Sequence, residues 1–165
     1  MRLNGSCHCG KVRFALDTHT PQPFMRCYCT VCRKTAGGGG YAINIMGEAA
    51  TLKVTGRRQV TCYRALAEQI EGGGDRSGRS QMRRYFCRHC GSALWGADPR
   101  WAQWVYPFAS AIDTPLPKPA EVVHLMLDFA APWVEVPRGP RHRRFQRYPE
   151  EAIIDWHKRR GLTVP

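Results

Sequence analysis

The sequence predicts a mainly β protein, built from short antiparallel strands, with one helix near the carboxyl end. Short β-prone runs recur along the 165 residues, and clusters of Gly, Pro or Asp separate many of them. The chain contains 16 Gly and 12 Pro, a composition that favours turns over long helices. Its length suits one compact domain, and 43% hydrophobic residues suffice for a core. We therefore expect a single domain over residues 1–165.

Alternating hydrophobic residues mark the first expected strand, over residues 11–16, whose apolar side chains share one face. Shorter β-prone runs follow in order at 24–25, 41–45, 51–54, 59–63, 82–86, 93–95, 103–108, 122–128 and 133–136. Residues 66–80 carry three consecutive glycines at 72–74 and are expected to form a mobile surface insertion. Strands this short, with turn residues between them, favour antiparallel pairing.

One helix is predicted over residues 149–160. A proline followed by two glutamates at 149–151 suits a helix N-terminus, and the basic run 158–160 suits its C-terminus. Gly161 is well placed to end the helix. The residues that share one helical face and should pack on the sheet are Ile153, Trp156 and His157.

Seven of the eight cysteines fall in three clusters. Cys7 and Cys9 form C-x-C, residues 27–32 contain C-x-C-x-x-C, and Cys87 and Cys90 form C-x-x-C. Such spacings present two sulfurs to one metal ion, and C-x-x-C is a standard zinc spacing. The first cluster follows Met1 too closely for an export signal, so we expect a cytoplasmic protein with reduced thiols. Zinc ligation is therefore favoured over disulfides, a redox dithiol or unligated buried cysteines.

Seven clustered cysteines are enough for two zinc sites per chain, one with four cysteine ligands and one with three. The two pairs together supply four ligands and a closed, structural site: Cys7, Cys9, Cys87 and Cys90. The triad leaves one coordination position open, as catalytic zinc sites do, and its ion is the more labile one: Cys27, Cys29 and Cys32. In the alternative arrangement, Cys62 or a histidine supplies a fourth ligand to the triad. Cys62 stands alone in a β-prone run and is expected in the core, whereas His8 and His89 are expected to point away from the metal.

At these motifs the chain resembles the glutathione-dependent formaldehyde-activating enzymes of the CENP-V/GFA group. The matching segments are 5–14, 27–34, 86–92 and, more loosely, 124–127 and 131–133, so the resemblance spans about residues 5–136. Residues 137–165 then form a basic C-terminal extension that contains the helix. The resemblance implies a β-tent zinc fold and the same division of the cysteines into structural and catalytic ligands. It also implies carbon–sulfur lyase chemistry, in which glutathione adds to formaldehyde and gives S-hydroxymethylglutathione.

An open zinc position suits this reaction, because the cation stabilises a bound thiolate, the competent nucleophile toward an aldehyde carbon. Three thiolates and one Zn²⁺ sum to a charge of about −1, so attraction of anionic glutathione has to come from surrounding basic residues. Arg33 and Lys34 follow the triad directly and are candidates for this role, although both are equally compatible with ordinary solvated charges. Gly38 and Gly39 are candidates for backbone contacts with a carboxylate, unless their run is only a turn.

A small-molecule thiol and an aldehyde are the expected partners, but a net charge of +12 leaves a second class of function open. A zinc-stabilised nucleic-acid-binding module would use the arginines of residues 138–147, interleaved with Phe145 and Tyr148. No nucleic-acid motif accompanies them, which disfavours this partner. A non-catalytic glutathione carrier would use the same pocket without turnover. No apolar run has the length of a membrane span, and the sequence does not indicate an oligomeric state.

Overall fold

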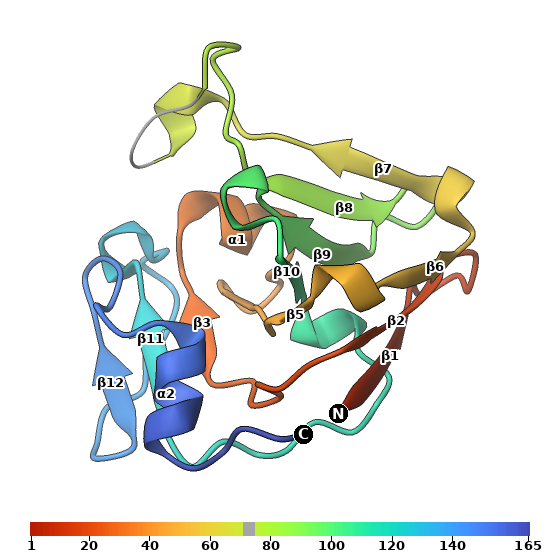
Figure 1. Cartoon of the computed structure of the whole chain (residues 1–165). Helices are drawn as coiled ribbons and strands as arrows, with labels where there is room; N and C mark the ends of the chain where they lie inside the picture. The colour runs from red at the N-terminus through yellow and green to blue at the C-terminus, as the bar shows by residue number, and fades with distance from the viewer. Residues whose placement is uncertain (71–74) are drawn as a thin grey trace.

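The computed structural model describes residues 1–70 and 75–165, which form three sheets and two short α-helices (Figure 1). This arrangement confirms the mainly β fold of short antiparallel strands with a C-terminal helix. The glycines at 72–74, the centre of the expected surface insertion, lie outside the described residues. Within the described part of the chain, every helix is too short or too polar to cross a membrane.

The first sheet is antiparallel and consists of β1 (Arg2–Ser6), β2 (Arg13–Asp17) and β6 (Lys53–Thr55), in the order β1-β2-β6. Leu3, Phe14 and Leu16 lie on its buried face, as the alternation in the second of these strands predicts. β1 was not expected, because its sequence holds a single large apolar residue. At Gly5 a Cβ atom would lie only 2.3 Å from the ring of Phe14, so glycine is needed for this pairing.

The second sheet is also antiparallel. It consists of β5 (Gly47–Glu48), β10 (Trp104–Pro107), β9 (Ala93–Ala97), β8 (Arg83–Cys87) and β7 (Val60–Tyr63), in that order. Leu94 and Trp95 of β9 belong to the same buried cluster as the apolar side chains of the first sheet, and Trp95 meets Phe14 edge to face at 5.3 Å between ring centroids. The first two sheets therefore share one hydrophobic core.

Cys62 lies on β7, which is an edge strand, and its side chain is exposed. The expectation that Cys62 belongs to the core is therefore wrong. The hydrophobic pattern of residues 59–63 shows that the run forms a strand, but it does not show whether the strand lies in the middle of a sheet or at its edge. At the edge, one side of β7 has no neighbouring strand in the described part of the chain.

The third sheet contains β12 (His142–Arg144), β11 (Val122–Leu125), β3 (Met25–Cys27) and β4 (Ala42–Ile43), in that order. β3 and β4 are antiparallel, whereas β11 runs parallel to both β3 and β12. The parallel pairs were not expected. Hydrophobic alternation reports which side chains share a face, but strand direction depends on the long connections that carry the chain back to the same end of the sheet.

Residues 133–136 form no strand in the described structure, contrary to the sequence prediction. They cross close to the turn that follows α1, where a Cβ atom at Gly40 would lie 2.3 Å from Val134. The Arg144 guanidinium donates a hydrogen bond to the Val136 carbonyl at 2.7 Å. The apolar residues of this segment therefore pack against a turn and do not pair with a neighbouring strand.

The predicted C-terminal helix is α2 (Ile153–Arg159), and residues 149–151 precede it. Gly161 follows the helix with φ of +63°, as a residue that ends a helix often does. Trp156 and His157 are buried, and the Trp156 ring stacks on Phe24 with 3.8 Å between centroids. The predicted packing face of the helix is confirmed.

The other α-helix, α1 (Thr30–Thr35), was not predicted, since it is only six residues long and rich in β-branched residues. Short 3-10 turns connect many of the strands: η1 (Ala49–Thr51), η2 (Arg57–Gln59), η3 (Ala67–Gln69), η4 (Pro99–Trp101), η5 (Ala109–Ala111) and η6 (Leu127–Phe129).

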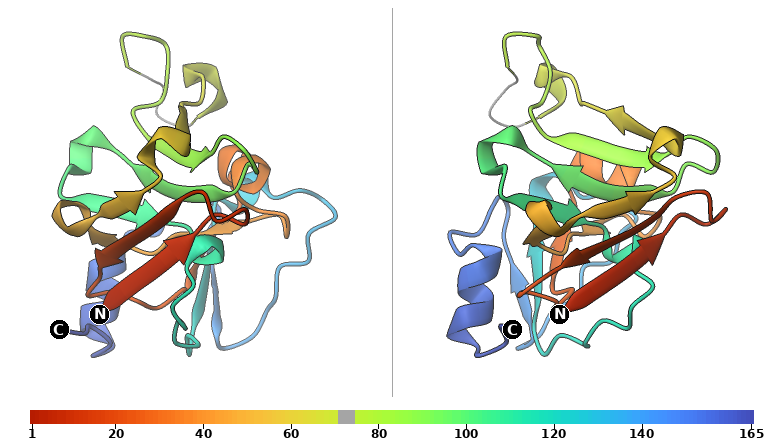
Figure 2. Two further views of the ribbon diagram at one scale, coloured as in Figure 1. Left: turned by 90° about the vertical axis from the view of Figure 1, so that its right-hand side faces the viewer. Right: turned by 45° about the vertical axis from the view of Figure 1, so that its right-hand side comes forward.

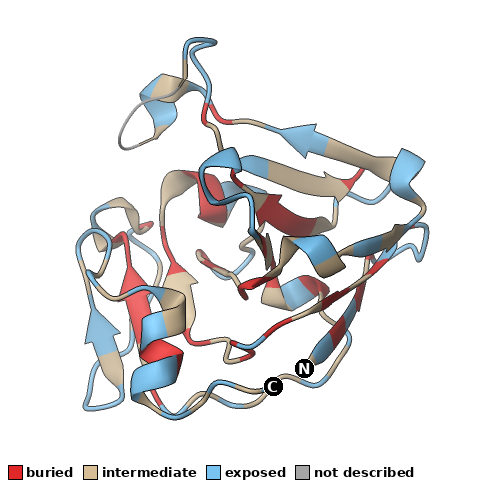
Figure 3. Cartoon of the chain, in the orientation of Figure 1, coloured by how far each residue is buried: buried red, intermediate tan, exposed pale blue. Residues whose placement is uncertain are grey.

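A second buried cluster lies between the third sheet and the two α-helices (Figure 3). It includes Phe24, Phe108 and Trp156, and also two cysteines, Cys27 and Cys32. Figure 2 shows α2 and the third sheet on one side of the molecule and β1 and β2 on the other. The cysteine triad thus belongs to the core on the α2 side, whereas Cys7 and Cys87 belong to the core between the first two sheets.

Candidate functional site

Four cysteines from distant parts of the chain meet at the ends of β1 and β8. Their sulfur atoms all lie within 4.8 Å of one another: Cys7, Cys9, Cys87 and Cys90. The Cys9 sulfur lies 3.5 Å from that of Cys7 and 3.8 Å from that of Cys87. In a tetrahedral site with Zn–S bonds of about 2.3 Å, neighbouring sulfurs are about 3.8 Å apart. Both the spacing and the donor set therefore fit zinc.

Two similar turns bring these sulfurs together. Each turn begins at a cysteine whose backbone N–H donates to a carbonyl five residues later, from Cys7 to Val12 and from Cys87 to Ser92, both at 3.0 Å. Each turn also contains a glycine in the left-handed region, with φ of +72° at position 10 and +70° at position 91. Only glycine adopts this conformation without strain, which explains why a glycine follows the second cysteine of each pair.

A neighbouring hydroxyl group makes one thiol of this cluster more acidic. A hydrogen bond from the Ser92 hydroxyl, 3.2 Å from the Cys90 sulfur, lowers the pKa of Cys90 to about 5. Cys90 therefore carries a thiolate at neutral pH even without a metal. A thiolate is the form in which cysteine binds zinc.

The second cluster is the triad formed by Cys27, Cys29 and Cys32, whose sulfur atoms also lie within 4.8 Å of one another. Cys27 ends β3, Cys29 caps the N-terminus of α1, and Cys32 lies in the first turn of that helix. The Cys29 sulfur accepts a hydrogen bond from the Cys32 backbone N–H at 3.3 Å. Cys27 and Cys32 are buried and Cys29 is half-buried, so a ligand reaches the triad most easily from the Cys29 side.

Within the triad the thiols share their protons unequally. Hydrogen bonds from Cys27 and Cys32 hold the pKa of Cys29 far below its usual value. The same hydrogen bond with Cys29 raises the pKa of Cys27 well above its usual value, because Cys27 is the donor. The metal-free triad therefore holds its negative charge on Cys29, and three-sulfur coordination of a metal requires loss of the remaining thiol protons.

A buried chain of hydrogen bonds holds the loop between Cys27 and Cys29. The Tyr28 hydroxyl and the His124 Nδ1 atom are 2.8 Å apart, and the His124 Nε2 atom lies 3.0 Å from the His142 Nδ1 atom. Burial and the neighbouring Arg26 charge lower the pKa of His124 to about 4, so the ring is neutral at physiological pH. These hydrogen bonds could not be predicted from the sequence, because they join side chains from three separate segments that meet only in the folded sheet.

Arg84, on β8, is a further neighbour of the triad that the sequence analysis missed. Its Nη2 atom lies 4.0 Å from the Cys32 sulfur, and its charge also lowers the pKa of Cys29, after the effect of the hydrogen bonds from the other two thiols. The alternation of residues 82–86 places Arg84 on one face of a strand, but only the packing of the sheet against α1 shows which element that face meets.

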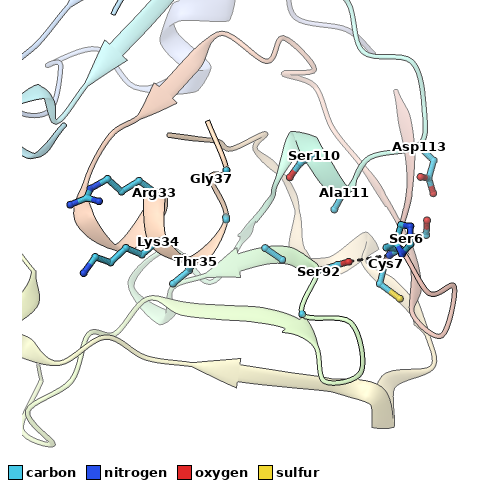
Figure 4. A pocket seen from close by; sticks show the side chains of 15 residues that line it. Ser6, Cys7, Arg33, Lys34, Thr35, Gly37, Ser92, Ser110, Ala111 and Asp113 are labelled. Carbon is cyan, nitrogen blue, oxygen red and sulfur yellow. Dashed lines mark hydrogen bonds between the residues drawn. The ribbon is translucent and has the colours of Figure 1, made fainter. Parts of the chain in front are cut away.

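A cavity of about 610 Å³ lies between the four-cysteine cluster, whose Cys7 lines it, and the C-terminal end of α1; the three triad cysteines are not among its lining residues. One wall contains Cys7, Ser92, Ser110 and Asp113, and the opposite wall is formed by residues 33–38 at the end of α1 and beyond. Figure 4 shows that the Arg33 and Lys34 side chains extend away from the Ser92 and Ser110 wall. Both residues line the cavity, but their charged ends point away from its opposite wall.

The glycine run after α1 is a turn, closed by a hydrogen bond of 3.0 Å from the Gly40 N–H to the Gly37 carbonyl. Gly37 and Gly40 are structurally required, since a Cβ atom would lie 2.1 Å from the Tyr41 carbonyl oxygen and 2.3 Å from the Val134 side chain, respectively. Gly38 and Gly39 are exposed, and Gly38 lines the cavity. Their contact with glutathione stays a prediction.

Within the described residues, neither Cys62 nor any histidine joins the sulfur atoms of the triad, which therefore stands as a three-cysteine group. His8 and His89 are exposed, and the His89 ring lies 2.6 Å from the Gln59 amide oxygen.

The arginines of the C-terminal extension are largely engaged with the protein itself. Arg143 lies 3.8 Å from Glu121, and Arg147 lies 2.8 Å from Asp128. Arg144 bonds the main chain of residues 136–137. These contacts reduce the positive charge that the segment presents to a nucleic acid.

The fold and the two cysteine clusters define a class: a mainly β protein with two candidate metal centres. A family model described as glutathione-dependent formaldehyde-activating enzyme, GFA, matches residues 2–125. The chain therefore belongs to the GFA family, which confirms the resemblance found in the sequence.

Two other comparisons extend this result. A curated protein of Halomonas elongata, provisionally named glutathione-dependent formaldehyde-activating enzyme, is 51% identical over 162 residues, covering 98% of each chain. Since this match continues well past residue 125, that relative shares the C-terminal extension. The crystal structure of a Rhodobacter sphaeroides protein superposes with a TM-score of 0.50 at 22% identity, covering 71% of this chain and 92% of that one. That similarity concerns the fold alone.

Proposed function

We propose that this protein is a zinc-dependent enzyme of the carbon–sulfur lyase type. It would join glutathione, or a similar thiol, to formaldehyde or a related small aldehyde and give an S-hydroxymethyl adduct. The observation that carries this proposal is the three-cysteine triad at the start of α1, the helix whose other end lines a cavity of about 610 Å³, in a member of the GFA family. A triad suits catalysis better than a four-cysteine site, because it leaves a metal coordination position open for a substrate.

The two clusters have different roles in this proposal. Cys7, Cys9, Cys87 and Cys90 would hold a structural zinc, and Cys27, Cys29 and Cys32 would hold the catalytic one. Zinc bound at the triad would supply a positive charge that stabilises the thiolate of the substrate.

In this proposal the protein residues around the triad hold the metal ligands in place and position the reactants. β3 and α1 fix the positions of Cys27 and Cys32, and the hydrogen bond between Tyr28 and His124 holds the loop that contains Cys29. The cavity beside α1 is large enough for a tripeptide-sized thiol, and binding there would lower the entropic cost of bringing thiol and aldehyde together. The bond formed joins the thiol sulfur to the aldehyde carbon, the carbonyl π bond breaks, and the thiol proton is transferred to the oxygen.

The test is a screen of thiols and aldehydes, with metal content measured in the same sample. We expect about two zinc ions per chain and formation of the adduct faster than the uncatalysed reaction. Cys29→Ser should lose the triad zinc and reduce turnover by more than about 100-fold, since substitutions of residues that only support a metal ligand already cost 10–100-fold. Magnetisation-exchange NMR measures the catalysed exchange between free thiol and adduct.

Cys62→Ser is the matched control, because Cys62 is an exposed cysteine outside both clusters. It should retain both zinc ions and full turnover. Unchanged turnover in Cys29→Ser would exclude the triad as the catalytic centre. Glutathione binding without turnover in the wild-type protein would identify a carrier in place of an enzyme.

A further inference from the structure

Arg84 occupies an unusual place for an arginine. It lies on β8, between β7 and β9, with Tyr63 and Gly96 as its direct neighbours across the sheet. The side chain is half-buried against α1, and its Nη2 atom lies 4.0 Å from the Cys32 sulfur. An arginine in such a position normally has a carboxylate partner.

Arg84 has no such partner in the described part of the chain. Its Nη1 atom is buried and contacts no hydrogen-bond acceptor, and the ion pairs found there do not include it. Other arginines of the chain illustrate the contrast, since Arg64 pairs with Asp75 and Arg100 with Asp98. The group of opposite charge that the structure places beside Arg84 is the triad, whose Cys32 sulfur lies 4.0 Å from Nη2 and whose Cys29 feels the arginine's charge.

The charges at this site can be added directly. Three thiolates and one divalent ion give about −1, and the guanidinium of Arg84 brings the sum to about zero. Binding of a thiolate substrate then takes the site to about −1. Without Arg84 the same step would take the site from about −1 to about −2 in a partly buried place, where like charges repel strongly.

We propose that Arg84 is the counter-cation of the cysteine triad and makes the site selective for negatively charged thiols. This inference rests on the function proposed above, because it assumes that a thiol binds at the triad. It deepens that function by assigning the charge preference to one residue. Arg84 would act through its charge, so lysine should replace it and a neutral side chain should not.

The test uses three small thiols that differ mainly in charge: 3-mercaptopropionate (anionic), 2-mercaptoethanol (neutral) and cysteamine (cationic). Their dissociation constants are measured by calorimetry on the full-length, zinc-loaded protein. The wild type should bind 3-mercaptopropionate most tightly. Arg84→Met should weaken binding of that thiol, which brings a carboxylate as well as a thiolate, by about ten-fold or more, weaken 2-mercaptoethanol less, and weaken cysteamine least, because its ammonium offsets its own thiolate. Arg84→Lys should retain the wild-type order.

Arg83→Met is the matched control, since Arg83 is exposed on the same strand and its side chain points to the opposite face. It should bind all three thiols as the wild type does. Zinc content and Tm are recorded for each variant, and Arg84→Gln replaces Arg84→Met if the latter does not retain two zinc ions.

Three results would overturn the inference: no preference for the anionic thiol in the wild type, an unchanged preference in the neutral variant, or a lost preference in Arg84→Lys. A different result would contradict the proposed function. A wild-type protein that prefers anionic thiols but joins none of them to an aldehyde would contradict the enzyme and leave the role of Arg84 intact.

Discussion

His157 shows how hydrogen bonding fixes the protonation state of a buried side chain. Its Nδ1–H donates to the Ile153 carbonyl at 2.8 Å, and its Nε2 atom accepts from the Gln22 backbone N–H at 3.1 Å. Both ring nitrogens are therefore used in the neutral form. A proton on Nε2 would face the Gln22 N–H and abolish that hydrogen bond.

This arrangement predicts a pH dependence of stability. Burial lowers the pKa of His157 in the folded state below the ordinary value of about 6.5. Since the unfolded chain takes up the proton first, the stabilising contribution is complete above about pH 6.5 and is lost as the pH falls through the folded pKa. The free energy of unfolding of the wild type should therefore decrease over this window more than that of His157→Gln.

Chemical denaturation of both proteins at a series of pH values measures this difference. Acid release of zinc affects the two proteins equally, so the difference between their curves isolates the imidazole. Parallel curves would show that His157 does not titrate on unfolding.

The cysteines and Arg84 mark the limit of sequence reasoning at the level of single residues. The division of the cysteines into groups of four and three could be predicted, because the spacing within each short motif identifies two pairs and a triad, and the two pairs together supply the four ligands of a closed site. The proximity of Arg84 to Cys32 could not, because it depends on how the second sheet packs against α1. Tyr28 and His124 are a similar case. Only the pairing of β3 with β11 brings the loop that contains Tyr28 next to the strand that contains His124.

Among the structural elements, the turn between α1 and β4 depends most on backbone conformation. Gly40 has φ of +86° and is buried against Val134 and Trp133. Gly40→Ala should lower the free energy of unfolding by about 2 kcal/mol, because alanine is strained at positive φ and its Cβ would displace the Val134 side chain.

Gly38→Ala is the control for this turn. No atom lies within 4 Å of a Cβ built at Gly38, and its φ is not positive. Its free energy of unfolding should change by no more than about 0.5 kcal/mol. Equal effects of the two substitutions, measured by urea denaturation, would contradict this account of the turn.

Most strands could be predicted because the alternation of apolar and polar residues is visible within each short segment of the sequence. The failures have physical causes. β5 and β12 are two and three residues long and exist because a neighbouring strand pairs with them, not because of their own composition. Residues 133–136 have a strand-like composition, but their apolar side chains pack against the turn that contains Gly40.

For the whole molecule, the two candidate zinc sites should differ in how tightly they bind the metal. The four-cysteine cluster connects β1 to the β8–β9 turn and contributes Cys7 and Cys87 to the core between two sheets. A chelator should remove the triad ion first, with a small effect on Tm, because only three protein ligands hold it. Removal of the second ion should lower Tm by about 10 °C or more, since binding at a structural site is coupled to folding.

Zinc content and Tm, measured together during a chelator titration, check this order. Cys87→Ser should reproduce the low Tm without chelator, whereas Cys62→Ser should have the wild-type Tm. Loss of both ions in a single step, or loss of the second ion without a change in Tm, would contradict the division into structural and labile sites.

The sequence separation of the ligands also has a consequence for the time at which each site forms during protein synthesis. The triad needs only residues 27–32, so its ligands leave the ribosome together and enclose a short loop. The four-cysteine cluster requires residues 87–90 as well as residues 7–9, and closing that long loop has a larger entropic cost. Until the second half of the site has been translated, Cys7 and Cys9 are an exposed pair of thiols on a nascent chain. The N-terminal half of the protein is therefore most vulnerable to oxidation before residue 90 emerges.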